Sequence, residues 1–105
     1  MKIQMNTDNI IEGDTELVQQ IKAEVGNSLE RFSEHITRVE IHLSDENSKN
    51  KSGADDKRCL LEARLAGLQQ IVVSHQAATV DEAIDGAIGK LIRTIDSTLG
   101  QLGKR

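Results

Sequence analysis

One long amphipathic stretch near the C-terminus constrains the fold most strongly. Between Thr79 and Leu102, apolar residues recur every three or four positions, which places them on one face of an α-helix. Thr79 followed by Glu82 fits a capping box, in which both side chains bond free backbone N–H groups at a helix start. The sequence therefore predicts a helix over residues 79–102. The apolar residues on its buried face are Val80, Ile84, Ala87, Ile88, Leu91, Ile95, Leu99 and Leu102.

A strand and another helical pattern occupy the first third of the chain. Ile3 and Met5 alternate with polar residues, which predicts a strand over residues 2–6. Asp14 is a candidate N-cap, and apolar residues with helical spacing follow as far as Ile36. We expect one long helix there, with a break at Gly26 and Asn27 as the alternative. The residues that carry the pattern are Val18, Ile21, Val25, Leu29, Phe32 and Ile36.

The middle of the chain changes to the period of two that is typical of strands. Apolar and polar residues alternate over 38–44 and again over 58–65, which predicts two half-buried strands. Residues 45–56 are polar and charged, so we expect a flexible loop there. Ala66 and Gly67 predict a tight turn into a further strand over residues 69–75, giving a hairpin.

The order of these elements predicts an α+β fold. Strand, helix, three strands and helix make a β-α-β-β-β-α two-layer sandwich, with a four-stranded sheet and both helices on one face. A chain of 105 residues is long enough for one modest core. We therefore expect residues 1–105 to form a single domain.

Composition narrows the classes of function. The formal net charge of −4 argues against a general binder of nucleic acid or membrane surfaces, although a local basic patch can coexist with it. Phe32 is the only aromatic residue, so the chain lacks a stacking platform for single-stranded nucleic acid. No apolar run has the length of a membrane span. A single cysteine and an N-terminal segment unlike a signal peptide lead us to expect a cytoplasmic protein.

Residues able to carry catalysis or bind a metal form no recognisable motif. His42, Cys59 and His75 are metal-ligand types, but their spacing matches no compact zinc signature. Strand alternation also turns His42 away from Cys59, which we expect to be a buried small hydrophobe. A phosphate loop, a nucleophile elbow and a dinucleotide fingerprint are all missing from the sequence. We expect no enzymatic activity, no metal and no cofactor.

Several segments together resemble one known family. They are Met1–Met5, Leu29–Phe32, Val39–Leu43, Ala83–Asp85 and Lys90–Arg93, and in this order they are similar to the ribosome hibernation promoting factors, also called ribosome-associated inhibitors or sigma modulation proteins. The resemblance implies a fold like the double-stranded RNA-binding domain. It also implies docking on the small ribosomal subunit near the decoding region, where the protein blocks messenger and transfer RNA and silences translation. We expect the extra C-terminal domain of longer family members to be missing.

Five cations are the candidate contacts to ribosomal RNA. Lys90 and Arg93 lie three residues apart, on one side of the last predicted helix, and Lys104 and Arg105 follow it. Arg31 matches a basic position of the family. Each cation placed on a phosphate releases about 0.7 to 0.9 counterions. The alternative interpretation is that all five are ordinary solvated surface residues.

A different class of function remains open beside this one. Leu60 and Val72 fall on the sheet face that the alternation assigns to solvent, where they would make a small apolar patch. This chain would then be a divergent family member that no longer binds ribosomes and acts as a dimeric protein-interaction module, a homodimer formed through the sheet face. A continuous cationic stripe through Arg31, Lys90 and Arg93 favours RNA, whereas carboxylates interrupting it favour a protein partner.

Overall fold

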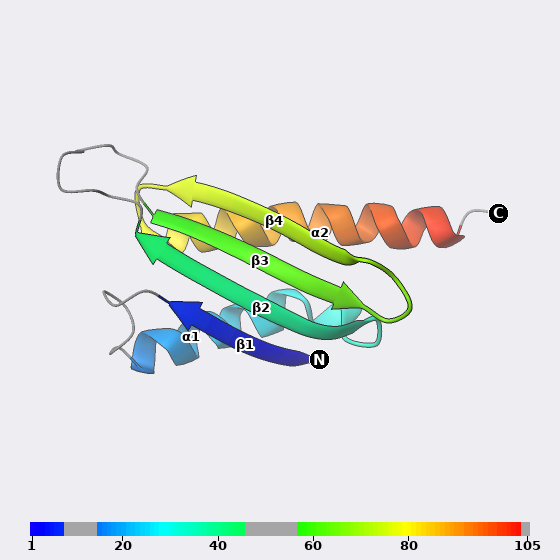
Figure 1. The fold of residues 1–105 in the computed structure, drawn as a ribbon, viewed down its shortest axis with the longest axis horizontal. Coiled ribbons are helices and arrows are strands. Elements are labelled where there is room, and N and C mark those ends of the chain that lie inside the picture. Colours follow the sequence, from blue (N-terminus) through cyan, green and yellow to red (C-terminus); the bar gives the residue numbers. More distant parts are fainter. Residues whose placement is uncertain (8–14, 46–56, 104–105) are drawn as a thin grey trace.

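The structure is a computed structural model that describes residues 1–7, 15–45 and 57–103. The predicted loop therefore lies outside the described residues, apart from Asp45 at the end of a strand. In chain order (Figure 1) the elements are β1 (Lys2–Thr7), α1 (Thr15–Ser28), the 3₁₀ helix η1 (Glu30–Phe32), β2 (Ile36–Asp45), β3 (Lys57–Leu65), β4 (Gln70–Ala77) and α2 (Val80–Gly103).

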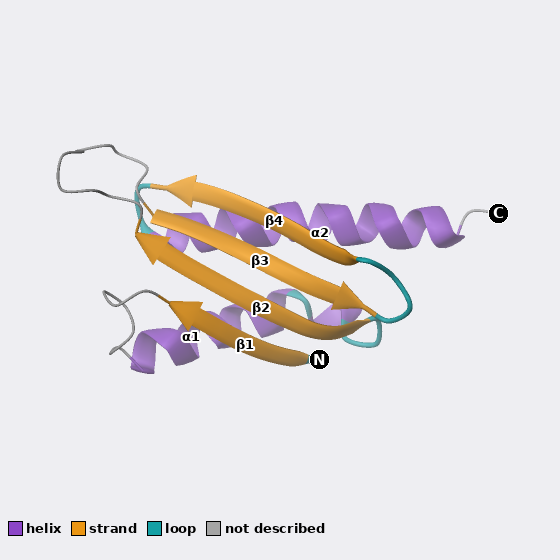
Figure 2. Cartoon of the chain, in the orientation of Figure 1, coloured by secondary structure: helices purple, strands orange, loops and turns teal. Residues whose placement is uncertain are grey.

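The four strands form one mixed sheet in the order β1-β2-β3-β4 (Figure 2). β1 is parallel to β2, while β2, β3 and β4 are successively antiparallel. Gly67 adopts a positive φ of 74° in the turn between β3 and β4, a conformation that glycine reaches without steric cost. Both helices lie on the same side of the sheet, α2 against β3 and β4 and α1 beside β1 (Figure 1). The predicted two-layer α+β architecture is confirmed.

The core lies between the sheet and the two helices and is almost entirely aliphatic. Alternate residues of β2 and β3 point into it, as the period of two predicts. Ile84, Leu91 and Ile95 of α2 complete it from the helical layer. Cys59 is fully buried among these side chains, and this burial raises the pKa of its thiol to about 12. Cys59 is therefore a core residue, as expected.

The first helix is shorter than the sequence predicts, so the expectation of one helix as far as Ile36 is wrong. α1 ends at Ser28, η1 follows, and β2 already begins at Ile36. Leu29, Phe32 and Ile36 are nevertheless all buried. Their spacing of three to four residues fits a tight 3₁₀ turn and a strand entry as well as an α-helix. The weak helix formers Gly26 and Asn27 allow the helix to end just beyond them.

The last helix matches its predicted range closely. The backbone N–H of Glu82 donates to the Thr79 hydroxyl over 3.1 Å, which confirms the threonine half of the predicted cap. Gly86 lies directly against His75 of β4, because a Cβ placed on Gly86 would come within 2.1 Å of the imidazole. α2 therefore approaches β4 closely, one turn before Lys90. Among the described helices, none is long and apolar enough to cross a bilayer.

Candidate nucleic-acid interface

Lys90 and Arg93 lie together on the exposed side of α2, next to the edge strand β4. Both side chains are exposed. The Lys90 Nζ atom donates to the backbone carbonyl oxygen of Ser74 over 2.8 Å, so the lysine leans over the sheet edge. Helical spacing of three keeps Arg93 beside it. The structure thus brings together two of the cations that the sequence predicts as contacts.

A shallow hollow between α2 and β4 surrounds these two cations. Its lining offers cationic groups and hydroxyl groups, and none of the residues that line it is acidic. The Thr94 hydroxyl also donates to the Lys90 carbonyl oxygen over 2.9 Å. Ammonium, guanidinium and hydroxyl groups are the side-chain donors that proteins use on phosphate oxygens. The α2–β4 hollow, lined by Val73, Ser74, Lys90, Arg93, Thr94, Ser97 and Thr98, is therefore suited to a phosphate group.

Arg31 is held on the other side of α2 by an acidic residue. Its Nη2 atom donates to Oδ2 of Asp96 over 2.8 Å, and its guanidinium lies 4.5 Å from the centre of the Phe32 ring. Asp96 lies three residues beyond Arg93, so a carboxylate separates Arg31 from the hollow. The structure does not join Arg31, Lys90 and Arg93 into one continuous stripe. Lys104 and Arg105 lie outside the described residues.

Carboxyl groups gather between the helices toward the start of α2. Glu24 of α1 is hydrogen-bonded to Asp85 of α2, and this bond, with burial and the charges of Asp85 and Asp81, raises the pKa of Glu24 to about 7. A protonated Glu24 can donate to the Asp85 carboxylate, which relieves the repulsion between the two acids. The surface of the helical layer is thus cationic around Lys90 and Arg93, and acidic near the start of α2.

The opposite face of the sheet is open and carries mostly polar side chains. Val72 is 55% exposed and Leu60 is half-buried, so both lie on this face as predicted. The register pairs Leu60 with Ser74 and Val72 with Glu62, which makes the two apolar residues diagonal neighbours. The apolar patch is small, and a charged side chain lies beside it.

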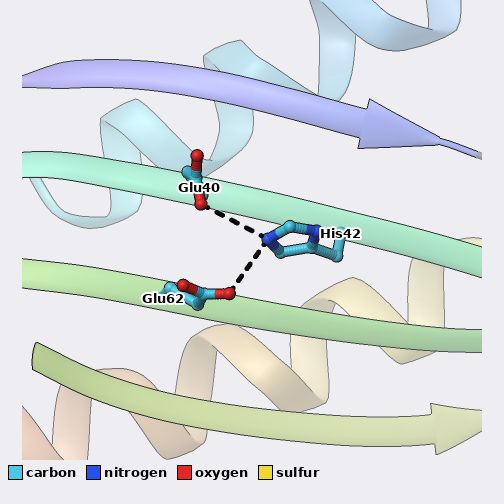
Figure 3. Close-up of side chains that lie close together, drawn as sticks. All are labelled: Glu40, His42 and Glu62. Carbon is cyan, nitrogen blue, oxygen red and sulfur yellow. Dashed lines mark ion pairs between the residues drawn. The ribbon is translucent and has the colours of Figure 1, made fainter.

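Sequence reasoning missed one cluster on this open face. Glu40 and Glu62 lie directly opposite each other on β2 and β3, and His42 follows Glu40 on the same face (Figure 3). His42 points away from the buried Cys59, as predicted. The alternation shows that Glu40 and His42 share a face, but only the register between β2 and β3 adds Glu62. Register is not readable from alternation alone.

Comparison with known proteins identifies the family of the chain. Residues 3–102 match the sequence profile of the sigma 54 modulation protein / S30EA ribosomal protein family. The chain therefore belongs to this family, which confirms the resemblance seen in its sequence segments. The family description names a modulation protein associated with the ribosome and no enzyme. No curated protein matches the chain in sequence.

Two solved structures share the fold. The N-terminal domain of Thermus thermophilus Protein Y superposes with a TM-score of 0.66 at 20% identity, covering 93% of this chain and 99% of that domain. A ribosomal subunit interface protein from Coxiella burnetii gives a TM-score of 0.70 at 16% identity, covering 95% of this chain and 99% of its own. At such low identity these likenesses show the fold.

Proposed function

We propose that this protein binds the small ribosomal subunit near the decoding region and inhibits translation by occupying the paths of messenger and transfer RNA. It catalyses no reaction, and it acts where ribosomes do, in the cytoplasm. The observation that carries the proposal is the α2–β4 hollow: a pair of exposed cations with surrounding hydroxyls and no acid in the lining, on a chain of a ribosome-associated family.

The local positive charge of the hollow allows binding to RNA although the net charge of the protein is −4. Attraction to phosphates falls off within about 8 to 10 Å at physiological salt, so the charges nearest the RNA decide the binding energy. Lys90 and Arg93 are exposed there, and the other residues that line the hollow are uncharged. The acidic residues Glu24, Asp81 and Asp85 lie farther along the helix pair, toward the start of α2.

Arg31 contributes to the same interface after exchanging partners. In its ion pair with Asp96, the Arg31 side chain is 61% exposed and the Asp96 side chain is 54% exposed. Such exposed pairs contribute only about 0 to 1 kcal/mol to folding. A phosphate can therefore replace the Asp96 carboxylate at little cost to stability. Lys104 and Arg105, which follow α2 in sequence, are the remaining proposed contacts.

Co-sedimentation of the protein with purified small subunits at about 50 and 200 mM salt tests the proposal. We expect saturable binding at the lower salt that weakens severely at the higher. The Lys90→Ala/Arg93→Ala variant should bind more weakly, and its log–log salt slope should be shallower by about 1.4 to 1.8, because two phosphate contacts are lost. Its stability should be nearly unchanged, since exposed charges contribute little to folding.

The matched control removes the same amount of charge from the opposite side of the molecule. Lys2 and Arg64 are exposed cations on the open sheet face, so the Lys2→Ala/Arg64→Ala variant has the same net charge as the Lys90→Ala/Arg93→Ala variant. We expect it to bind like the wild type. Equal weakening of both variants would show that only net charge matters and would remove the hollow from the proposal.

A second candidate function rests on the acid that interrupts the cationic stripe. Asp96 pairs with Arg31, so a carboxylate interrupts the cationic stripe, which is the feature that favours a protein partner over RNA. In this case two copies pair through the open sheet face around Val72, and ribosome binding is lost. Sedimentation equilibrium distinguishes the two functions: a dimer that Val72→Lys dissociates, without ribosome binding at either salt concentration, supports the second.

A further inference from the structure

The cluster missed by sequence reasoning has the composition of a metal site. One oxygen of each glutamate approaches the same imidazole nitrogen: Nε2 of His42 lies 3.5 Å from Oε1 of Glu40 and 3.1 Å from Oε2 of Glu62 (Figure 3). All three donor atoms lie within 4.8 Å of one another. Like charges directly opposite each other on neighbouring strands are destabilising. The facing pair of Glu40 and Glu62 therefore favours a cation between them.

Each of the three donor groups is oriented by a different neighbour. Arg38 donates to Oε2 of Glu40, and Gln70 donates to Oε1 of Glu62. These bonds occupy the outer oxygen of each carboxylate and leave the inner oxygen facing His42. The amide nitrogen Nδ2 of Asn6 on β1 lies 3.5 Å from Nδ1 of the imidazole. Such outer partners are what fixes the orientation of ligands in metal sites.

Two of the three separations between the donor atoms also fit a tetrahedral ion. Ligands bound to Zn²⁺ at 2.0 to 2.1 Å are about 3.3 Å apart at tetrahedral angles, close to the two separations observed around Nε2. About a third of the His42 side chain is exposed. Its Nε2 atom is nevertheless shielded from solvent, and its polar neighbours in the described part of the chain are the two glutamate oxygens. A ring nitrogen directed between two carboxylates can bind a cation when the proton of the imidazole lies on Nδ1.

We propose that Glu40, His42 and Glu62 bind a divalent transition metal of the zinc type on the open sheet face. Imidazole favours Zn²⁺ and its transition-metal neighbours over Mg²⁺ and Ca²⁺, which prefer oxygen ligands alone. Each glutamate supplies one oxygen, and His42 supplies Nε2 with its proton on Nδ1, where the Asn6 amide oxygen can accept it after a flip of the amide. Three protein ligands leave a fourth position for water.

Titration of the metal-free protein with Zn²⁺, followed by calorimetry, tests this site. We expect one equivalent to bind, and Co²⁺ in its place to show the visible absorption bands of a four-coordinate ion. His42→Ala and Glu62→Gln should each weaken binding at least tenfold. Gln70→Ala, which removes only an orienting bond, should weaken it about tenfold. Bound Zn²⁺ should also raise the melting temperature of the wild type and not that of His42→Ala.

The matched control is His35→Ala, since His35 is an exposed histidine outside the cluster. It should bind Zn²⁺ like the wild type. Far-UV circular dichroism of each variant checks that the sheet is intact. The proposal is overturned if the wild type shows no saturable binding, or if His42→Ala binds Zn²⁺ as tightly as the wild type does. Equal loss in His35→Ala would show adventitious binding to surface histidines and would overturn it as well.

Discussion

Replacing Gly86 by alanine tests how closely α2 packs on β4, the contact that positions the α2–β4 hollow. The new Cβ would lie 2.1 Å from Cδ2 and 2.4 Å from Cγ and Nε2 of His75. Carbon atoms in favourable contact are about 3.5 to 4.0 Å apart, so the imidazole or the helix must move by more than about 1 Å. Lys90 follows one turn later and depends on the same approach for its bond to Ser74.

Two opposing effects determine how Gly86→Ala changes the free energy of unfolding. Alanine in place of a helical glycine stabilises the helix by about 0.8 to 1 kcal/mol, whereas an extra carbon forced into a packed contact costs about 1 to 3 kcal/mol. We therefore expect Gly86→Ala to lower the free energy of unfolding by about 0 to 2 kcal/mol. Gly100 has nothing within 4 Å of its would-be Cβ, so Gly100→Ala should raise it by about 0.5 to 1 kcal/mol.

Urea unfolding followed by far-UV circular dichroism measures both variants under the same conditions. The His75→Ala background supplies the decisive comparison, because the clash partner is then gone and Gly86→Ala should stabilise about as much as Gly100→Ala. That cycle isolates the contact between the two residues. If Gly86→Ala stabilises the otherwise wild-type protein as much as Gly100→Ala does, α2 and β4 are not as close as described.

Three further perturbations have defined outcomes. The bond to Asp85 and burial raise the pKa of Glu24 to about 7. The folded state therefore binds more protons than the unfolded state between about pH 4.5 and 7, and stability falls as pH rises through this range. Glu24→Gln should raise the urea midpoint at pH 8 and not at pH 4. Burial raises the pKa of the Cys59 thiol from 9.0 to about 12, so stability should fall as pH rises above about 9, and a thiol reagent should react only on unfolding; rapid labelling of the native protein would contradict this. Asp96→Asn frees Arg31 and should tighten ribosome binding in co-sedimentation while changing stability by less than about 1 kcal/mol; unchanged binding would remove Arg31 from the interface.

The fold was predictable because most of its elements have an unambiguous period. Buried residues alternate with more exposed ones from Val39 to Ser44 in β2 and from Cys59 to Leu65 in β3, and α2 combines a helical stripe with the Thr79 cap. The prediction of the first helix was wrong for a physical reason. Leu29, Phe32 and Ile36 are all buried, but they belong in turn to a loop, a 3₁₀ turn and a strand. A spacing of three to four residues does not distinguish that succession from one α-helix.

The candidate sites were predictable only where they lie within one element. The pairing of Lys90 with Arg93 follows from helical spacing, and the structure places both on the exposed side of α2. Contacts between elements do not follow from the sequence. The pair of Arg31 with Asp96 joins residues 65 positions apart, and the cluster around His42 depends on the register of β2 and β3. Tertiary packing determines both the ion pair and the cluster.

Chemical footprinting of the ribosomal RNA in small subunits saturated with this protein, at about 50 mM salt, tests the central claim most directly. The proposed function predicts protection of nucleotides in the decoding region, lost with Lys90→Ala/Arg93→Ala and kept with Lys2→Ala/Arg64→Ala. Saturable binding with protection confined to another part of the subunit, or no protection at all, would contradict it.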